Sequence, residues 1–250
     1  MKNKTIVVWF SCGAASAVAA KLTVEKYGKD NNVLVVNNPV DEEHSDNRRF
    51  LKDVEKWIGQ EIIIATNSEL GHTSAEQVWI DRKYMAGIKG APCTGLLKKA
   101  ARYEFERKVK VDYHVLGFTY EERHRHERFI KAERENVIPI LIEDRITKRE
   151  CFGFLLHCGI ELPKAYKSYP NANCIGCPKA TSPKYWDAVR RNDPNVFTLR
   201  AELSRKLNVR LVRYHGKRIF LDELPEVIER KHPYDINYNM PECGIFCDSE

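Results

Sequence analysis

The chain has 250 residues, of which 43% are hydrophobic and 30% are charged, and its formal net charge is +6. This composition excludes a disordered or collagen-like chain, and no stretch approaches the roughly 20 apolar residues that a membrane span needs. The amino terminus does not read as a signal peptide, so we expect a cytoplasmic protein with no membrane partner.

The first 65 residues alternate between apolar runs and helical patterns. Ile6 to Phe10 is a continuous apolar run, typical of a buried parallel strand, and Val33 to Val36 and Glu61 to Ala65 predict two more strands. Between them, Ala17 to Tyr27 and Ser45 to Trp57 have helical patterns. The alternation predicts βαβ units, and therefore an α/β fold with a mainly parallel sheet flanked by helices, Rossmann-like in architecture.

The alternation continues through a more charged middle segment. We expect a basic helix with a solvated face over Thr94 to Lys108, a strand over Tyr113 to Phe118, and a short strand over Asn136 to Ile142. Thr147 to Cys158 predicts a capped helix because Glu150 follows Thr147 by three residues. Cys151 and Cys158 are seven residues apart on this helix, so both are expected on its core-facing side.

The turn after the first strand has the residues of a phosphate site. Ser11, Gly13 and Ser16 lie between a buried strand and a helix. A helix amino terminus offers unpaired N–H groups and the positive end of its dipole, and small residues let a phosphate approach the backbone. The alternative is a tight turn that uses small residues for packing alone.

The carboxy-terminal third differs in composition and carries paired cysteines. From about Ile160, Pro, Asn, Gly and Tyr become frequent, so we place a boundary near Leu162 between a nucleotide-binding core (residues 1–161) and a Cys-rich region with its tail (residues 162–250). Cys174 and Cys177 form one close pair, and a second pair, Cys243 and Cys247, lies near the end. In a cytosolic chain such pairs indicate a thiolate metal site, zinc or iron–sulfur, rather than disulfides. Buried, reduced cysteines are the alternative.

These motifs together resemble a known superfamily. The turn at Ser11 resembles the Ser-Gly-Gly-x-Asp-Ser loop of the ATP pyrophosphatases, and more closely its degenerate form in the sulfonucleotide (PAPS/APS) reductases. Further similar segments follow in the family's order: Glu43 to Phe50, Pro92 to Lys98, Gly117 with Glu121 to Arg123, Asn173 to Pro178, and Glu242 to Gly244. The resemblance spans nearly the whole chain and implies an adenine nucleotide alpha hydrolase-like fold.

The resemblance also implies roles for individual residues. By position, Cys93, Cys174 and Cys177 would hold a 4Fe–4S cluster (or zinc), and Cys243 would be the nucleophile on the tail. Thr94 stands where the family has a second cysteine, so Cys247 is the candidate for the fourth ligand. The competing arrangement is a structural site made of Cys174, Cys177, Cys243 and Cys247. Phe246, where the family has His, weakens the transfer of the catalytic role.

The nucleotide site implied by the resemblance extends beyond the turn. Lys98, Gly117 and Arg123 would join Ser11, Gly13 and Ser16 in binding an adenylyl sulfate. Ala14 and Ala15 stand where an ATP pyrophosphatase carries Lys and Asp, which argues against ATP cleavage and for the reductase branch.

Three functions follow as hypotheses. The first is reduction of PAPS or APS to sulfite through an S-sulfonate on Cys243, with a thioredoxin-like thiol as reductant. The second is nucleotide-dependent sulfur transfer to DNA or tRNA, which the net charge of +6 permits. The third is a nucleotide-binding protein without catalysis, in which the metal holds the tail.

Overall fold

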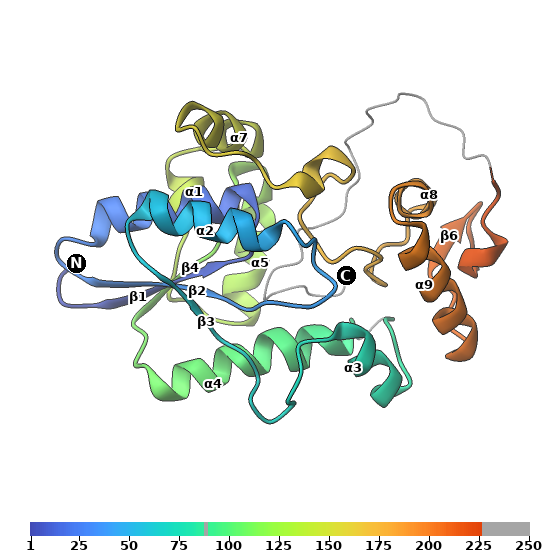
Figure 1. Cartoon of the computed structure of the whole chain (residues 1–250). Coiled ribbons are helices and arrows are strands. Elements are labelled where there is room, and N and C mark those ends of the chain that lie inside the picture. The colour runs from blue at the N-terminus through green and yellow to red at the C-terminus, as the bar shows by residue number, and fades with distance from the viewer. Residues whose placement is uncertain (88–89, 227–250) are drawn as a thin grey trace. The chain divides into compact units, whose positions relative to one another are not determined.

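The computed structural model describes residues 1–87 and 90–226, so Cys243, Phe246 and Cys247 lie outside the described residues. The chain divides into two compact units (Figure 1). Unit 1 contains residues 1–39, 45–68 and 100–163, and unit 2 contains residues 40–44, 69–99 and the chain from Lys164 onward. The chain therefore crosses between the units several times, and residues 69–99 cluster with the carboxy-terminal region.

Unit 1 is built on a five-stranded parallel sheet, which confirms the predicted fold class. Its order is β3-β2-β1-β4-β5, and every neighbouring pair is parallel. The strands are β1 (Thr5–Phe10), β2 (Asn32–Asn37), β3 (Ile62–Ile64), β4 (Tyr113–Val115) and β5 (Val137–Ile138). The chain passes from β1 outward through β2 to β3 and then returns to the other side of β1, so the order reverses between β1 and β4.

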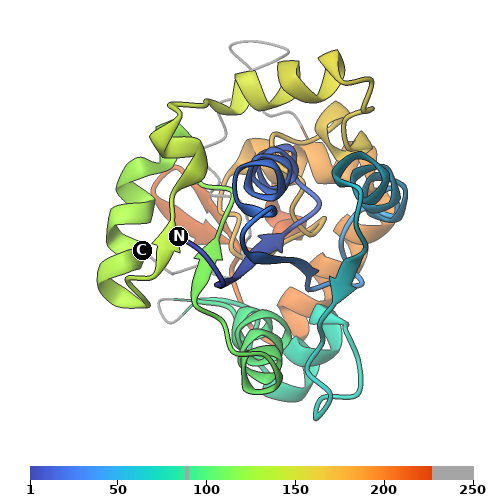
Figure 2. The same cartoon turned by 90° about the vertical axis from the view of Figure 1, so that its left-hand side faces the viewer.

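Helices cover both faces of this sheet. They are α1 (Ala14–Tyr27), α2 (Asn47–Ile58), α4 (Ala100–Lys108), α5 (Arg123–Ala132), α6 (Ile140–Glu143) and α7 (Lys148–His157). Successive side chains of a strand point to opposite faces. On β1, Phe10 packs against Phe50 of α2, whereas Trp9 packs edge-to-face on Phe105 of α4. Figures 1 and 2 accordingly show α1 and α2 on one face and α4 on the other.

The predictions for the last strand of unit 1 and for helix α7 hold only in part. The strand expected over Asn136 to Ile142 ends at Ile138, because Pro139 lacks an N–H and becomes the N-cap of α6. The capping box of α7 is present as predicted, with Thr147 and Glu150 bonded reciprocally. The expectation for Cys158 is wrong, however: it is the C-cap of α7 and is exposed at the end of the helix, while Cys151 is buried.

Unit 2 is mainly helical with a two-stranded hairpin. Its elements are α3 (Ala75–Arg82), the π-helix η1 (Thr94–Lys99), the 3₁₀ turns η3 (Lys164–Lys167) and η4 (Leu221–Glu223), α8 (Pro183–Asn192), α9 (Pro194–Lys206), and the antiparallel strands β6 (Val212–Tyr214) and β7 (Lys217–Ile219). Two fully buried indoles, Trp79 of α3 and Trp186 of α8, lie in its core. The Trp186 N–H donates to the Ala180 carbonyl at 2.7 Å, so its one polar atom is paired.

Among the residues that the structure describes, no helix combines the length and apolar character required to cross a membrane.

Candidate functional site

The β1–α1 turn is held by its own hydroxyl groups. Ser16 accepts hydrogen bonds from the Ser11 N–H at 3.1 Å and the Ser11 hydroxyl at 3.2 Å, and its own hydroxyl donates to the Gly13 carbonyl at 2.9 Å. Between them Cys12 adopts a left-handed conformation (φ 57°), and Gly13 is the extended N-cap of α1. Both serines therefore shape the turn, and Cys12 is a buried turn residue rather than an exposed nucleophile.

The loop after β4 packs directly on this turn. A Cβ atom added to Gly117 would lie 2.7 Å from the backbone nitrogen of Ser16 and 2.9 Å from its Cα, so only glycine allows this approach. Because the strand order reverses between β1 and β4, the two loops meet where open α/β sheets bind their ligands, outside the carboxyl ends of the strands. The structure thus brings Ser11, Gly13, Ser16 and Gly117 together.

The amino terminus of α1 suits an anion. Its first turn has no acidic residue, and Gly13 supplies no capping side chain. The contrast is α3 in unit 2, where the Glu42 carboxylate accepts from the N–H groups of Ala75 at 2.7 Å and Glu76 at 2.9 Å. The amino terminus of α3 is thus occupied by a carboxylate of the protein itself. The amino terminus of α1, at the switch point of the sheet, has no carboxylate in its first turn.

The two cations expected at the nucleotide site have different surroundings. Arg123 is exposed at the start of α5, where its guanidinium donates to the Tyr120 carbonyl at 3.3 Å and stacks on the Tyr120 ring. Lys98 lies in unit 2, is 5% exposed, and pairs with the Glu43 carboxylate at 3.0 Å. The expected solvated basic face is wrong for Lys98 and also for Arg102, which is fully buried.

Sequence reasoning missed a buried charged cluster around Arg102 in unit 1. The Trp9 indole N–H donates to Nδ1 of His114 at 3.0 Å, Arg134 contacts Nε2 of the same ring, and Glu106 pairs with Arg134 at 3.0 Å. Burial, together with Arg134 and Arg102, lowers the pKa of His114 to about 3, so the ring is neutral. The residues of this cluster come from α4, β4 and the segment after α5, and its one sign in the sequence is the polar His114 in the middle of the strand Tyr113–Val115.

In unit 2, three predicted metal ligands belong to one packed cluster. Cys174 and Cys177 are buried in the core, and the half-buried Cys93 packs against that core. Tyr185 and Trp186 pack there too, so the polar sequence around Cys174 does not keep the pair out of a core. Cys174 also lines a small hollow; its other lining residues are Tyr169, Pro170, Asn171, Asn173, Ile175 and Tyr185.

The turn Cys174–Cys177, hereafter the cysteine knuckle, is organised by a tyrosine. The Tyr185 hydroxyl accepts from the N–H groups of Gly176 at 2.9 Å and Cys177 at 3.3 Å, and it donates to the Cys174 carbonyl at 3.4 Å. Gly176 permits this turn with its positive φ of 69°. Complete burial raises the pKa of Tyr185, so its hydroxyl stays protonated. The two N–H groups therefore face the tyrosine oxygen.

This geometry tests whether the described residues fit a metal or an iron–sulfur cluster. Among residues 1–87 and 90–226, no three His, Cys, Asp or Glu side chains converge in a way that could hold a metal ion. The N–H groups that would stabilise thiolates are bonded to Tyr185. The described residues therefore do not form a cluster site by themselves, and Cys243 and Cys247 lie outside them.

Comparison with known proteins does not place the chain in a family. No protein-family model and no curated protein sequence matches the chain. Among solved structures, the chain is similar to the U34-tRNA thiolase NcsA from Methanococcus maripaludis with its [4Fe-4S] cluster, at 14% sequence identity and a TM-score of 0.49, over 83% of this chain and 74% of that one. A similarity at this level establishes no shared function.

Proposed function

We propose that the chain is an adenine-nucleotide-dependent enzyme of sulfur chemistry. The observation that carries this proposal is the contact of Gly117 with the β1–α1 turn at the switch point of the sheet. A nucleotide phosphate would lie against the amino terminus of α1, close to the backbone of Ser11, Gly13, Ser16 and Gly117. Arg123 would leave Tyr120 to clamp a phosphate or sulfate oxygen. Lys98, already paired with Glu43, is left out of this set.

The first candidate reaction is reduction of an adenylyl sulfate. The Cys243 thiolate would attack the sulfate sulfur, an S–S bond would form, and the bond from that sulfur to the phosphate oxygen would break with its electron pair on the departing nucleotide. A thioredoxin-like thiol would then attack the Cys243 sulfur, releasing sulfite and leaving a mixed disulfide that its second thiol resolves. The absence of a cation at Ala14 and Ala15 favours this reaction over ATP cleavage.

The cysteines of unit 2 would have a structural role beside this reaction, as ligands of a metal. Cys93, Cys174 and Cys177 share one core, and with Cys247 they would supply four thiolates to a 4Fe–4S cluster or zinc. Four thiolates would require the sulfur atoms of Cys93, Cys174 and Cys177 to move together, because no three potential ligands converge among the described residues. Metal content and the absorption spectrum of anaerobically purified protein test this part separately.

The test of the reaction is sulfite release from PAPS or APS in the presence of dithiothreitol or thioredoxin. Cys243→Ser should abolish it, whereas the matched control Cys158→Ser, which removes an exposed thiol at the end of α7, should leave it unchanged. Sulfite from neither nucleotide, with nucleotide binding intact, would refute the reductase reaction. If the nucleotide is bound and no chemistry follows with any substrate, the protein is a nucleotide-binding protein without catalysis.

A second candidate reaction is nucleotide-dependent sulfur transfer to a nucleic acid. The observation that favours it is a run of 19 residues, 203–221, with six Lys and Arg and no Asp or Glu. Pyrophosphate release from ATP that depends on added RNA or DNA would support this reaction. Sulfite release without any requirement for nucleic acid would support the first.

A further inference from the structure

The basic run of residues 203–221 folds partly into a well-anchored hairpin, β6–β7. Its two-residue turn places His215 at φ 44° and Gly216 at φ 77°, the left-handed pair of a type I′ turn. Val212 is buried in the core of unit 2, and the Arg213 N–H donates to the Thr181 carbonyl at 2.9 Å. The hairpin is therefore a fixed support for the exposed side chains that it carries.

The hairpin and the residues that lead into it carry several cations without acidic partners. Arg205 pairs with Asp222 and Glu223 at 2.8 Å. The other five cations have no Asp or Glu within ion-pair distance among residues 1–87 and 90–226. They are Lys206, Arg210, Arg213, Lys217 and Arg218, all exposed. The charged run at the start of α5 differs, because its basic side chains have acidic partners within the run: Arg125 pairs with Glu122, and His124 lies beside Glu127.

Two of these cations face each other across the hairpin. Arg213 is the direct register partner of Arg218, and like charges in such a pair destabilise a sheet. Arg218 donates to the Leu211 carbonyl at 2.9 Å, and its pKa is lowered by burial and then by Arg213. The folded protein thus maintains a repulsive contact that an anion bridging the two guanidinium groups would relieve.

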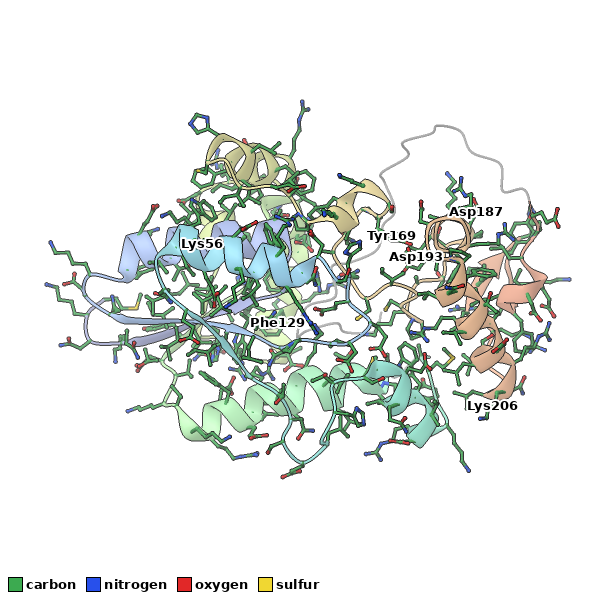
Figure 3. All side chains as sticks on the ribbon, viewed as in Figure 1. Lys56, Phe129, Tyr169, Asp187, Asp193 and Lys206 are labelled. Carbon is green, nitrogen blue, oxygen red and sulfur yellow. The ribbon has the colours of Figure 1, made fainter. Side chains whose placement is uncertain are left out.

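Aromatic rings accompany the cations at the tip. The exposed ring of His215 lies edge-to-face on Tyr214, with ring centroids 4.1 Å apart, and Lys217 is the register partner of Tyr214. Cations that contact phosphates beside a ring that stacks on a base are the combination by which proteins hold unpaired nucleic acid. Figure 3 shows Lys206 at the end of α9, whose following residues lead into the hairpin.

We propose that the β6–β7 hairpin binds the sugar-phosphate backbone of a single-stranded or looped nucleic acid, with phosphates on Arg213, Lys217 and Arg218 and a base stacked on His215. This surface deepens the second candidate reaction by supplying its substrate class. It lies entirely in unit 2, whereas the nucleotide turn lies in unit 1, so the two can fail independently.

The test is fluorescence anisotropy of a labelled 20-nucleotide RNA and its DNA equivalent with the full chain, titrated over a range of salt concentrations. The triple variant Arg213→Gln/Lys217→Gln/Arg218→Gln should weaken binding about tenfold or more at moderate salt. It should also reduce the magnitude of the slope of log K against log[salt] by about 2, because each of the three lost phosphate contacts contributes roughly 0.7 to that slope. His215→Asn keeps a residue that tolerates positive φ and removes the ring, so it should weaken binding about fivefold with the slope unchanged.

The matched control, Lys29→Gln/Lys56→Gln/Lys131→Gln, removes three exposed cations of unit 1 that form no ion pair within the described part of the chain. It should bind within twofold of the unaltered chain. Equal losses in both triple variants, no binding by the unaltered chain, or equal affinity for heparin or for vesicles of phosphatidylserine would overturn the proposal. ATP or PAPS binding, measured on the same variants, reports separately on unit 1 and should not change.

Discussion

The close approach of Gly117 to the β1–α1 turn predicts the effect of a single methyl group. In Gly117→Ala the new Cβ would lie 2.7 Å from the Ser16 nitrogen, 0.7 Å short of the 3.4 Å at which ordinary contact begins. All three of its nearest atoms are backbone atoms of Ala15 and Ser16, so no side chain can rotate away. The loop or the first turn of α1 must move, and overpacking of this kind costs about 1–3 kcal/mol. The smaller entropy of the unfolded alanine chain offsets about 0.4–1 kcal/mol of that cost.

The matched control is Gly153→Ala in α7. Gly153 is exposed in the middle of a helix, and a Cβ atom there meets nothing within 4 Å. The control should therefore raise the thermal midpoint, because alanine is about 0.5–1 kcal/mol more favourable than glycine in a helix.

Thermal unfolding and calorimetric titration with PAPS, APS and ATP compare the two variants. Gly117→Ala should lower the midpoint and weaken nucleotide binding about tenfold or more, whereas Gly153→Ala should leave the affinity unchanged. Unchanged affinity in a folded Gly117→Ala protein would show that the nucleotide does not bind at this turn.

Three further predictions concern buried polar groups. Lys98→Met should destabilise the protein by about 3–5 kcal/mol because it removes the cation that pairs with the largely buried Glu43 carboxylate, and Glu43→Gln in the same chain should restore part of that loss in a denaturant titration. Tyr185→Phe leaves the two N–H groups of the cysteine knuckle without their acceptor, so it should cost about 1–3 kcal/mol and speed alkylation of both thiols by iodoacetamide. His114, with its pKa lowered to about 3, binds a proton more readily when unfolded, so stability should fall by about 2 kcal/mol between pH 6.5 and pH 5. His114→Asn, which keeps an acceptor for the indole N–H, should flatten that dependence; an unchanged slope would refute the assignment.

The sheet could be predicted from the sequence because its signal is local. The apolar runs at Ile6 to Phe10 and Val33 to Val36 are typical of strands buried on both faces, and they form β1 and β2. The small residues of the β1–α1 turn likewise marked the switch point. The importance of Gly117 was indicated only by resemblance, because a close backbone approach leaves no periodic pattern.

The organisation of unit 2 could not be predicted in this way. Cys93 and Cys174 are 81 positions apart, and only the fold shows that residues 69–99 pack with the carboxy-terminal region. The same limit applies to Lys98, whose partner Glu43 lies 55 residues earlier. A basic residue on a helical pattern has the same local signature whether it faces solvent or a carboxylate from another segment.

Because the chain divides into two units, variants in each unit can test whether the two units act together. The proposed function puts nucleotide binding in unit 1 and thiol chemistry in unit 2, so Gly117→Ala should change nucleotide affinity without changing the alkylation rates of the knuckle cysteines. Tyr185→Phe should do the reverse. The double variant Gly117→Ala/Tyr185→Phe then tests whether both units act in one step of turnover. If they do, its loss of activity should differ from the product of the two single losses by more than about twofold, which corresponds to a coupling free energy above roughly 0.5 kcal/mol. Strict multiplication of the two effects on turnover would mean that the variants disturb independent steps, and joint action of the two units would then have to be abandoned.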